Sequence, residues 1–198
     1  MLLLYSIAAG LLLGRLLGGR LGNLENLRFV WWQVALAGLA VQLVLFSGPV
    51  EERIGSVGVP IYVISTLAVM AALLRNMRFR GLVIIAVGAA LNLIVVIANG
   101  GAMPSAPDAW LALNGVAEVP VAHFSNSVLI GPGTWFPFLG DVFVWPRPLP
   151  LANVFSIGDV IIAVGAVVFL VSAMRKPAET TLDAATDTPT SAIVPAHR

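Results

Sequence analysis

The sequence predicts an all-α integral membrane protein with five transmembrane helices and a folded cap on the outer side. Its 198 residues are 59% hydrophobic and only 11% charged, whereas soluble domains are about 45–50% apolar and about 25% charged. The mean hydropathy is +0.95. Five apolar stretches have nearly or fully the length of a helical span, which is about 20 residues. These stretches are continuously apolar rather than alternating, which favours helices over the strands of a membrane barrel.

The predicted spans belong to a membrane domain over residues 1–176. They cover residues 2–17, 29–46, 57–74, 81–98 and 154–174. A signal peptide is the competing interpretation of the first span, but no positively charged stretch precedes its apolar run, so we interpret it as a helix. Arg15 lies near the end of this span, where an arginine side chain can reach the headgroups. Residues 177–198 are rich in Ala, Thr and Pro without periodicity, which predicts a disordered tail.

The distribution of basic residues predicts the orientation of the spans. Most of these residues lie after the first span, after the third span and at the end of the last span. They are Arg15, Arg20, Arg28, Arg75, Arg78, Arg80, Arg175 and Lys176. With five spans these three segments share one side, and short loops rich in Lys and Arg stay in the cytoplasm. The N-terminus is therefore predicted outside and the C-terminus inside, with the lipid bilayer as the main partner.

Glycines recur every four residues along the first predicted span and just beyond it. Gly10, Gly14, Gly18 and Gly22 form one smooth stripe on a helix, along which another backbone can approach closely. One interpretation is a contact face for a homodimer or another protein partner. The other, which we favour, is packing against neighbouring helices of the same chain.

The stretch 99–152 is predicted to be the folded outer cap. It contains eight prolines and is too polar for an ordinary span, yet it carries many aromatic residues, which disordered segments lack. A connection of this length with its own apolar content is usually functional. Within it, "TWFPFLGDVFVW" is predicted to be an interfacial or re-entrant piece, which needs protein or water to satisfy its backbone.

Composition also argues against several classes of site. The chain has no cysteine and only two histidines, His123 and His197, so thiolate and His-rich metal sites are not expected. The net charge is +1, and no basic patch with interleaved aromatics is present, so nucleic acid is not expected as a partner. No cofactor is predicted.

Two carboxylates near the last span are the candidates for chemistry. Asp141 lies in "FLGDVF" of the outer cap, and Asp159 lies in "NVFSIGDVII" at the start of the last span. Two like charges held close together push one pKa upward, so such a pair can share acid and base roles, activate a water and hydrolyse an amide. The two are eighteen positions apart with three prolines between them, which leaves open whether the chain brings them together.

Asp159 also has a purely structural interpretation. "SIGD" has the form of a capping box, with Ser156 as the N-cap and Asp159 three residues later. A carboxylate at this position suits the positive end of the helix dipole. It would also lie at the membrane interface, where a charge is tolerated far better than at the bilayer centre.

Several polar residues are predicted at the same depth as this pair and could support a binding site. They are Asn92, Asn99, Asn153, Ser156, Gln42 and His123. The alternative for Asn92 and Gln42 is ordinary hydrogen bonding between helices, worth about 0.6 kcal/mol each on average. After Asn99, Gly100 and Gly101 either end the helix with a left-handed turn or expose backbone amides to a ligand.

The layout from Leu2 to Lys176, with the motifs "NGGAMP", "LGD" and "NVFSIGD", resembles a bacterial family of small membrane proteins called domain of unknown function 5317. The resemblance covers nearly the whole chain. It implies a multi-pass protein of the bacterial inner membrane, and it brings no activity with it.

A second, local resemblance is to lipoprotein signal peptidase (signal peptidase II), a membrane aspartic protease. "NGGA", "LGDVF" and "NVFSIGDVII" are similar to three short motifs of that family. The resemblance implies Asp141 and Asp159 as the catalytic pair, with Asn99 and Asn153 as supporting residues. The order of spans between the motifs differs from that of the peptidase.

Three functions follow as hypotheses. We favour a non-enzymatic membrane protein, a scaffold or partner subunit, with an outward-facing polar site. The alternative is a membrane-embedded aspartic hydrolase that uses Asp141 and Asp159. A small transporter with Asp159 and Asn92 along its path is the third, weakened by the lack of an internal repeat.

Overall fold

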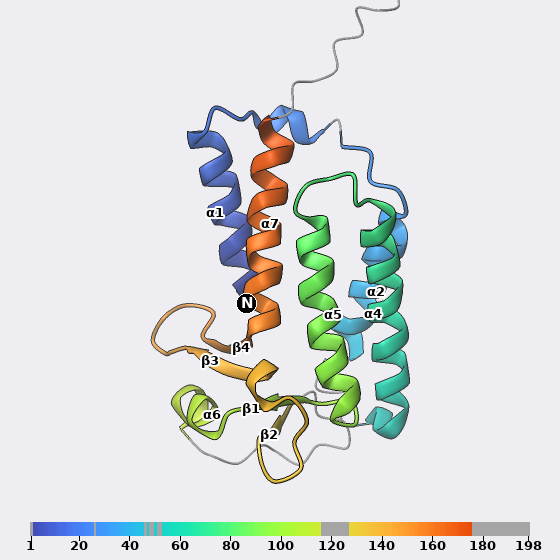
Figure 1. Cartoon of the computed structure of the whole chain (residues 1–198), viewed down its shortest axis with the longest axis vertical. Coiled ribbons are helices and arrows are strands. Elements are labelled where there is room, and N and C mark those ends of the chain that lie inside the picture. The colour runs from blue at the N-terminus through green and yellow to red at the C-terminus, as the bar shows by residue number, and fades with distance from the viewer. Residues whose placement is uncertain are drawn as a thin grey trace, which may run out of the picture.

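The computed structural model describes residues 2–25, 27–45, 47, 50, 53–115 and 127–175. Five long helices occupy the five apolar stretches of the sequence (Figure 1). They are α1 (Leu2–Leu16), α2 (Trp32–Leu45), α4 (Gly58–Arg75), α5 (Leu82–Ala98) and α7 (Ile157–Arg175). The predicted tail and His123 lie outside the described residues.

Four of the long helices, α1, α7, α5 and α4, stand side by side in a row, and α2 packs behind α4 (Figure 1). In spatial order α1 packs on α7, α7 on α5, α5 on α4, and α4 on α2 (Figure 1). Helices α1 and α7 run in the same direction, and the others alternate. Helices α7 and α5 are neighbours near the centre of this order. The candidate carboxylate Asp159 lies in the first turn of α7.

The small residues of α1 are used within the chain. An added Cβ on Gly10 would lie 2.9 Å from Leu170 of α7, and one on Gly19 would lie 2.8 Å from Met174. Gly14 also faces Met174, whereas Gly18 and Gly22 have no such neighbour within 4 Å. Packing against a neighbouring helix, the interpretation that we favoured, therefore describes Gly10 and Gly14.

A second set of glycines brings α5 and α7 together, and the sequence analysis missed it. Gly88 of α5 faces Gly158 of α7, and Gly81, just before α5, faces Gly165. In each helix the two glycines are seven residues apart, which places them on one face. A Cβ on Gly88 would lie 2.6 Å from the Gly158 carbonyl oxygen and 2.9 Å from the Ile162 nitrogen, so only glycine fits this approach.

Three strands of a small sheet lie in the stretch 99–152, and the fourth overlaps the start of the last predicted span, so the all-α prediction is wrong for this part of the chain. The strands are β1 (Met103–Ser105), β2 (Ser127–Leu129), β3 (Asp141–Trp145) and β4 (Asn153–Ser156). Their order is β2-β1-β3-β4, with β1 parallel to β2 and β3, and β3 antiparallel to β4. Helix α6 (Pro107–Asn114) packs on β3 and β4. The segment "TWFPFLGDVFVW" forms a 3-10 turn, Pro137–Leu139, followed by β3.

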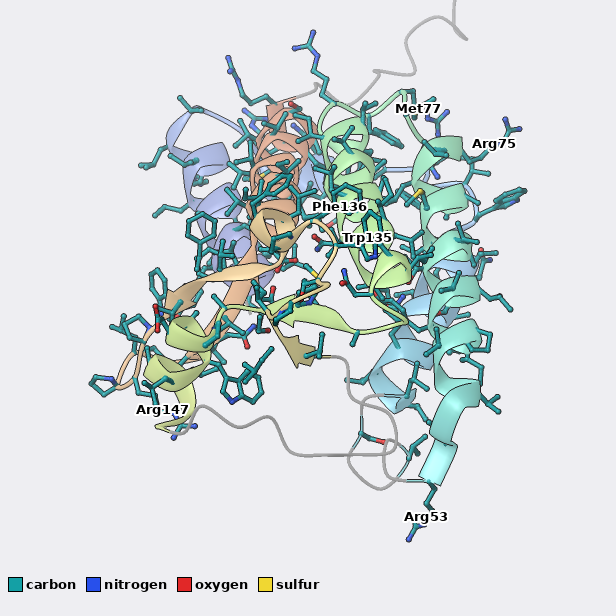
Figure 2. The ribbon with its side chains drawn as sticks, turned by 60° about the horizontal axis from the view of Figure 1, so that its bottom comes forward. Arg53, Arg75, Met77, Trp135, Phe136 and Arg147 are labelled. Carbon is teal, nitrogen blue, oxygen red and sulfur yellow. The ribbon has the colours of Figure 1, made fainter. Side chains whose placement is uncertain are left out.

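The sheet lies at one end of the helical row, which we call the sheet end (Figure 1). The opposite end, which we call the basic end, carries seven of the nine described arginines. They are Arg15, Arg20, Arg28, Arg75, Arg78, Arg80 and Arg175. Figure 2 shows Arg75 and Met77 at the basic end and the two remaining arginines, Arg53 and Arg147, at the sheet end.

Two of the described helices, α4 and α7, are long and apolar enough to cross a membrane. Helices α1, α2 and α5 are apolar but shorter, with 15, 14 and 17 residues. The prediction of an apolar helical protein is therefore confirmed in its coarse form, and helix length supports a membrane crossing for two of the five predicted spans.

Candidate functional site

A polar cavity of about 150 Å³ lies at the sheet end, where α4, α5 and α7 meet the strands. We call it the sheet-end cavity. Its wall is formed by Tyr62, Asn92, Val96, Gly101, Met103, Ser127, Asp141 and Asp159. The two candidate carboxylates, which the sequence places eighteen residues apart, therefore line one cavity.

The start of α7 fixes the position of Asp159. The backbone N–H of Ser156 donates to Asp159 Oδ2 at 3.1 Å, and the backbone N–H of Asp159 donates to Ser156 Oγ at 3.0 Å. These reciprocal hydrogen bonds form the capping box that "SIGD" predicts. They satisfy two amide groups that have no partner within the helix.

Asn92 of α5 joins this capping box across the helix interface. Its Nδ2 donates to Asp159 Oδ1 at 2.9 Å, and its Oδ1 accepts a hydrogen bond from Ser156 Oγ at 2.9 Å. The two bonds fix which way the amide points. Gly158 makes this contact possible, because any Cβ at that position would overlap the Asn92 side chain.

Asp141 begins strand β3 and lies opposite Ser156 of β4 in the sheet register. Burial, and after it the nearby Asp159 carboxylate, raise the pKa of Asp141 to about 7. Ser105 of β1, the register partner of Asp141 on its other side, acts in the opposite direction on this pKa. Asp141 therefore exchanges its proton near neutral pH.

Strand β1, which contributes Met103 to the cavity wall, also carries the buried hydroxyl of Ser105. The residue is fully buried, with 0% of its surface exposed, and its Oγ has no partner at regular hydrogen-bond geometry. Ser105 is paired with Asp141 in the sheet register, and its hydroxyl lowers the pKa of that carboxyl. Buried polar groups are usually satisfied, so an unpaired hydroxyl next to a carboxyl indicates a polar site.

Three of the predicted supporting residues lie away from the cavity wall. Asn99 binds the loop before β3, since its side chain donates to the Trp135 carbonyl and accepts from the Trp135 N–H, each at 2.9 Å. Asn153 pairs with Trp145 at the far end of β4. Gln42 of α2 donates to Thr66 of α4 at 3.0 Å, which matches the interpretation as a hydrogen bond between helices.

The glycines after Asn99 end helix α5 rather than offering free amides. The N–H of Gly101 donates to the Val96 carbonyl at 2.8 Å, and the N–H of Gly100 donates to the Ile97 carbonyl at 3.3 Å. Both glycines have positive φ angles, 71° for Gly100 and 103° for Gly101. This is the helix-ending interpretation, with both amides already used. Gly101 still contributes to the cavity wall.

Sequence reasoning did not single out the wall residues Tyr62, Val96, Met103 and Ser127. Tyr62 lies in the third apolar stretch, where its hydroxyl was a weak signal of an inward-facing position. Met103 and Ser127 belong to strands β1 and β2, which the sequence analysis did not predict. Within the described residues, no group of three or more His, Cys, Asp or Glu side chains is placed to hold a metal ion.

Replacing Ser156 with alanine should weaken folding, because it removes the N-cap oxygen and the bond to Asn92. We expect a loss of about 0.5–2 kcal/mol, the usual effect of removing such a cap. Thermal unfolding of the purified protein in detergent measures it. Ser47→Ala is the matched control, because the described bond of the Ser47 hydroxyl is local, to the Val44 carbonyl. Equal effects of the two changes would contradict a structural role for the capping box.

The fold and the site define a class: a mostly helical protein with two helices able to cross a membrane and a carboxylate-lined cavity between its helices and a small sheet. The family model described as "family of unknown function (DUF5317)" matches residues 26–171. The chain therefore belongs to this family. No curated protein and no solved structure matches the chain.

Family membership confirms the first of the two resemblances. The second, to lipoprotein signal peptidase, is not borne out. Of the four residues that it implied, Asp141 and Asp159 line the same cavity. Asn99 bonds the loop before β3, and Asn153 pairs with Trp145 in the sheet. The two asparagines therefore do not support the carboxylates as that resemblance requires.

Proposed function

We propose that this chain is a multi-pass protein of the bacterial cytoplasmic membrane that binds a small polar solute in the sheet-end cavity without chemical turnover. Five helices would cross the bilayer, with the sheet end outside and the basic end in the cytoplasm. The observation that carries the proposal is the cavity itself, in which side chains of α4, α5, α7 and the sheet converge around two carboxylates.

The surface of the helices supports the membrane part of the proposal. Large apolar side chains are exposed on all five long helices, including Leu16 at 72%, Leu43 at 78%, Ile64 at 67%, Ile97 at 53% and Val164 at 51%. Exposed apolar surface of this extent marks contact with a membrane or a partner. The concentration of arginine at one end also fits a cytoplasmic side. Short helices are accommodated by local thinning of the bilayer.

The cavity supports solute binding more than amide hydrolysis. Both Asp159 oxygens already accept hydrogen bonds, one from Asn92 and one from the Ser156 amide, and this carboxylate is part of the helix cap. An aspartic hydrolase needs its pair of carboxylates free to hold and activate a water. A volume of about 150 Å³ holds roughly five waters at about 30 Å³ each, enough for a small solute.

Accessibility of introduced cysteines tests this proposal, because the natural chain has none. Three single replacements are informative: Met103→Cys in the cavity wall, Leu149→Cys, exposed at the sheet end, and Met77→Cys, exposed at the basic end. None of them changes the charge of the chain. The probes are a small membrane-impermeant thiosulfonate that carries trimethylammonium and a polymer-linked maleimide, each added to intact cells.

We expect Leu149→Cys to react with both probes and Met103→Cys to react only with the small one. Met77→Cys should react only after lysis. An unreactive Met103→Cys in intact cells, alongside a reactive Leu149→Cys, would rule out a solute cavity open to the outside. Reaction of Met77→Cys in intact cells would reverse the orientation.

A further inference from the structure

We infer that the solute bound in the sheet-end cavity carries a small primary ammonium group, which lies between the carboxyl groups of Asp141 and Asp159. This inference rests on the proposed function and names the chemical class of its ligand. It is argued from the charge, the hydrogen-bonding capacity and the size of the cavity.

The charge of the wall favours a cation. Of the eight described residues that line it, two are carboxylic acids and none is lysine, arginine or histidine. Among the described side chains, the arginines of the sheet end, Arg53 and Arg147, are not part of the wall. An anionic solute would be repelled by two carboxylates, whereas a cation within about 4–6 Å favours their charged forms.

The hydrogen-bonding capacity of the wall points the same way. The Asn92 amide donates through Nδ2 to Asp159 and accepts through Oδ1 from Ser156. Its orientation is therefore fixed, and both of its polar atoms have a partner without a ligand. Asp141 and the remaining lone pairs of Asp159 are acceptors when ionised. A primary ammonium offers three donors and no acceptor, which complements such a wall.

The position of Ser105 independently favours the ionised form of Asp141. Its hydroxyl is fully buried beside the Asp141 carboxyl and has no regular hydrogen-bond partner. A hydroxyl in this position is ready to donate to an ionised carboxylate, and hydrogen bonds to charged groups are the stronger ones. A bound cation that keeps Asp141 ionised would make the carboxyl beside this buried hydroxyl a stronger acceptor.

The size and place of the cavity narrow the ligand further. About 150 Å³ accommodates an aminoethyl group with its hydration. The cavity lies where α5 ends and α7 begins, the level at which the headgroups of a bilayer around these helices would lie. The ammonium could therefore come from the ethanolamine headgroup of a phospholipid or from a free small amine, which share this chemistry.

Binding should depend on pH through Asp141. Among the described residues, the titratable side chains that face it are Asp159 of α7 and Tyr62 of α4, and the positive charge of the chain's amino terminus also acts on it. With a pKa of about 7, the ionised fraction of Asp141 rises from about one tenth at pH 6 to about nine tenths at pH 8. An amine with a lysine-like pKa near 10 stays protonated over this range. Affinity should therefore increase up to about tenfold between these two pH values.

The experiment measures binding of radiolabelled ethanolamine to the full chain in phosphatidylcholine nanodiscs. We expect saturable binding that strengthens from pH 6 to pH 8. Asp141→Asn should weaken it at least tenfold at pH 8 and remove its pH dependence. Asp108→Asn, which removes an exposed carboxylate from α6 outside the cavity wall, is the matched control and should leave binding unchanged. Equal weakening by both changes would contradict the inference, because only a general surface charge would then be involved.

Two other radiolabelled probes separate this inference from the proposed function. Binding of neutral ethylene glycol or anionic glycolate in place of ethanolamine, lost in Met103→Trp, would keep the cavity as a solute site and overturn the ammonium assignment. Binding of none of the three would overturn both. Nanodiscs that contain phosphatidylethanolamine distinguish the sources: loss of free ethanolamine binding there identifies the lipid headgroup, and unchanged binding identifies a free amine.

Discussion

Asn76→Ala should produce the largest loss of stability of any single change considered for this chain, about 1.5–4.5 kcal/mol. Asn76 is fully buried at the basic end, just after α4. Its side chain accepts from the Val30 N–H at 2.8 Å and donates to the carbonyls of Val30 and Ala72, each at 2.7 Å. Three hydrogen bonds worth about 0.5–1.5 kcal/mol each give the expected range.

These bonds attach the entry of α2 to the end of α4, so the change should also loosen α2. Chemical denaturation of the purified protein in mixed detergent micelles measures the stability. Asn23→Ala is the matched control, because the Asn23 side chain makes a single described bond, to the Met174 carbonyl at 2.7 Å. Its expected loss is about 0.5–1.5 kcal/mol. A loss for Asn76→Ala no greater than that of Asn23→Ala would show that the three bonds are not jointly formed.

Gly158→Ala is the second change with a large expected effect, a loss of about 1–3 kcal/mol from overpacking. The new methyl group would overlap the Asn92 side chain and lie 2.9 Å from the Gly88 carbonyl oxygen. The carbonyl belongs to the backbone and cannot move aside without moving α5. The change should therefore separate the two helices that carry Asn92 and Asp159.

The same denaturation measurement applies, with Gly22→Ala as the control. Gly22 has an ordinary backbone angle and no neighbour within 4 Å of an added Cβ, so its replacement should change stability by less than about 0.5 kcal/mol. Gly158→Ala should in addition weaken ethanolamine binding, since it displaces Asn92. Wild-type stability of Gly158→Ala would mean that α5 and α7 are farther apart than the structure shows.

The positions of the long helices and the capping box could be predicted because both signals are local. A continuous apolar run and the four residues "SIGD" each define their structure without reference to distant parts of the chain. The seven-residue spacing of Gly81 and Gly88, repeated in Gly158 and Gly165, was also readable and was overlooked. Its meaning depends on the pairing of α5 with α7, which the sequence does not state.

The sheet could not be predicted because its strands lack the usual signals. They are only three to five residues long, and β1 has Pro104 at its centre, although it is flanked on both sides by other strands. A proline normally argues against an interior strand, because it has no N–H to donate. With the sheet unseen, the partners of Asp141 across it, Ser105 and Ser156, could not be identified either.

Both acids of the candidate site could be selected from the sequence, but only some of the residues around them could. Asp141, Asp159 and Asn92 were selected because ionisable and amide groups in or beside apolar spans are rarely placed there without a partner. The same rule also selected Asn99 and Gln42, whose partners turned out to be a loop backbone and a neighbouring helix. Residue type indicates that a polar group needs a partner, but only the fold shows which one.

The row arrangement has a consequence for how the architecture can vary. Helix α1 stands at one edge of the row, packs mainly on α7, and precedes the residues 26–171 that match the family. The other four long helices alternate in direction, so the unit that they form begins and ends at the basic end. Removal of α1 would therefore leave the two ends of this unit, and the position of the cavity between them, as they are.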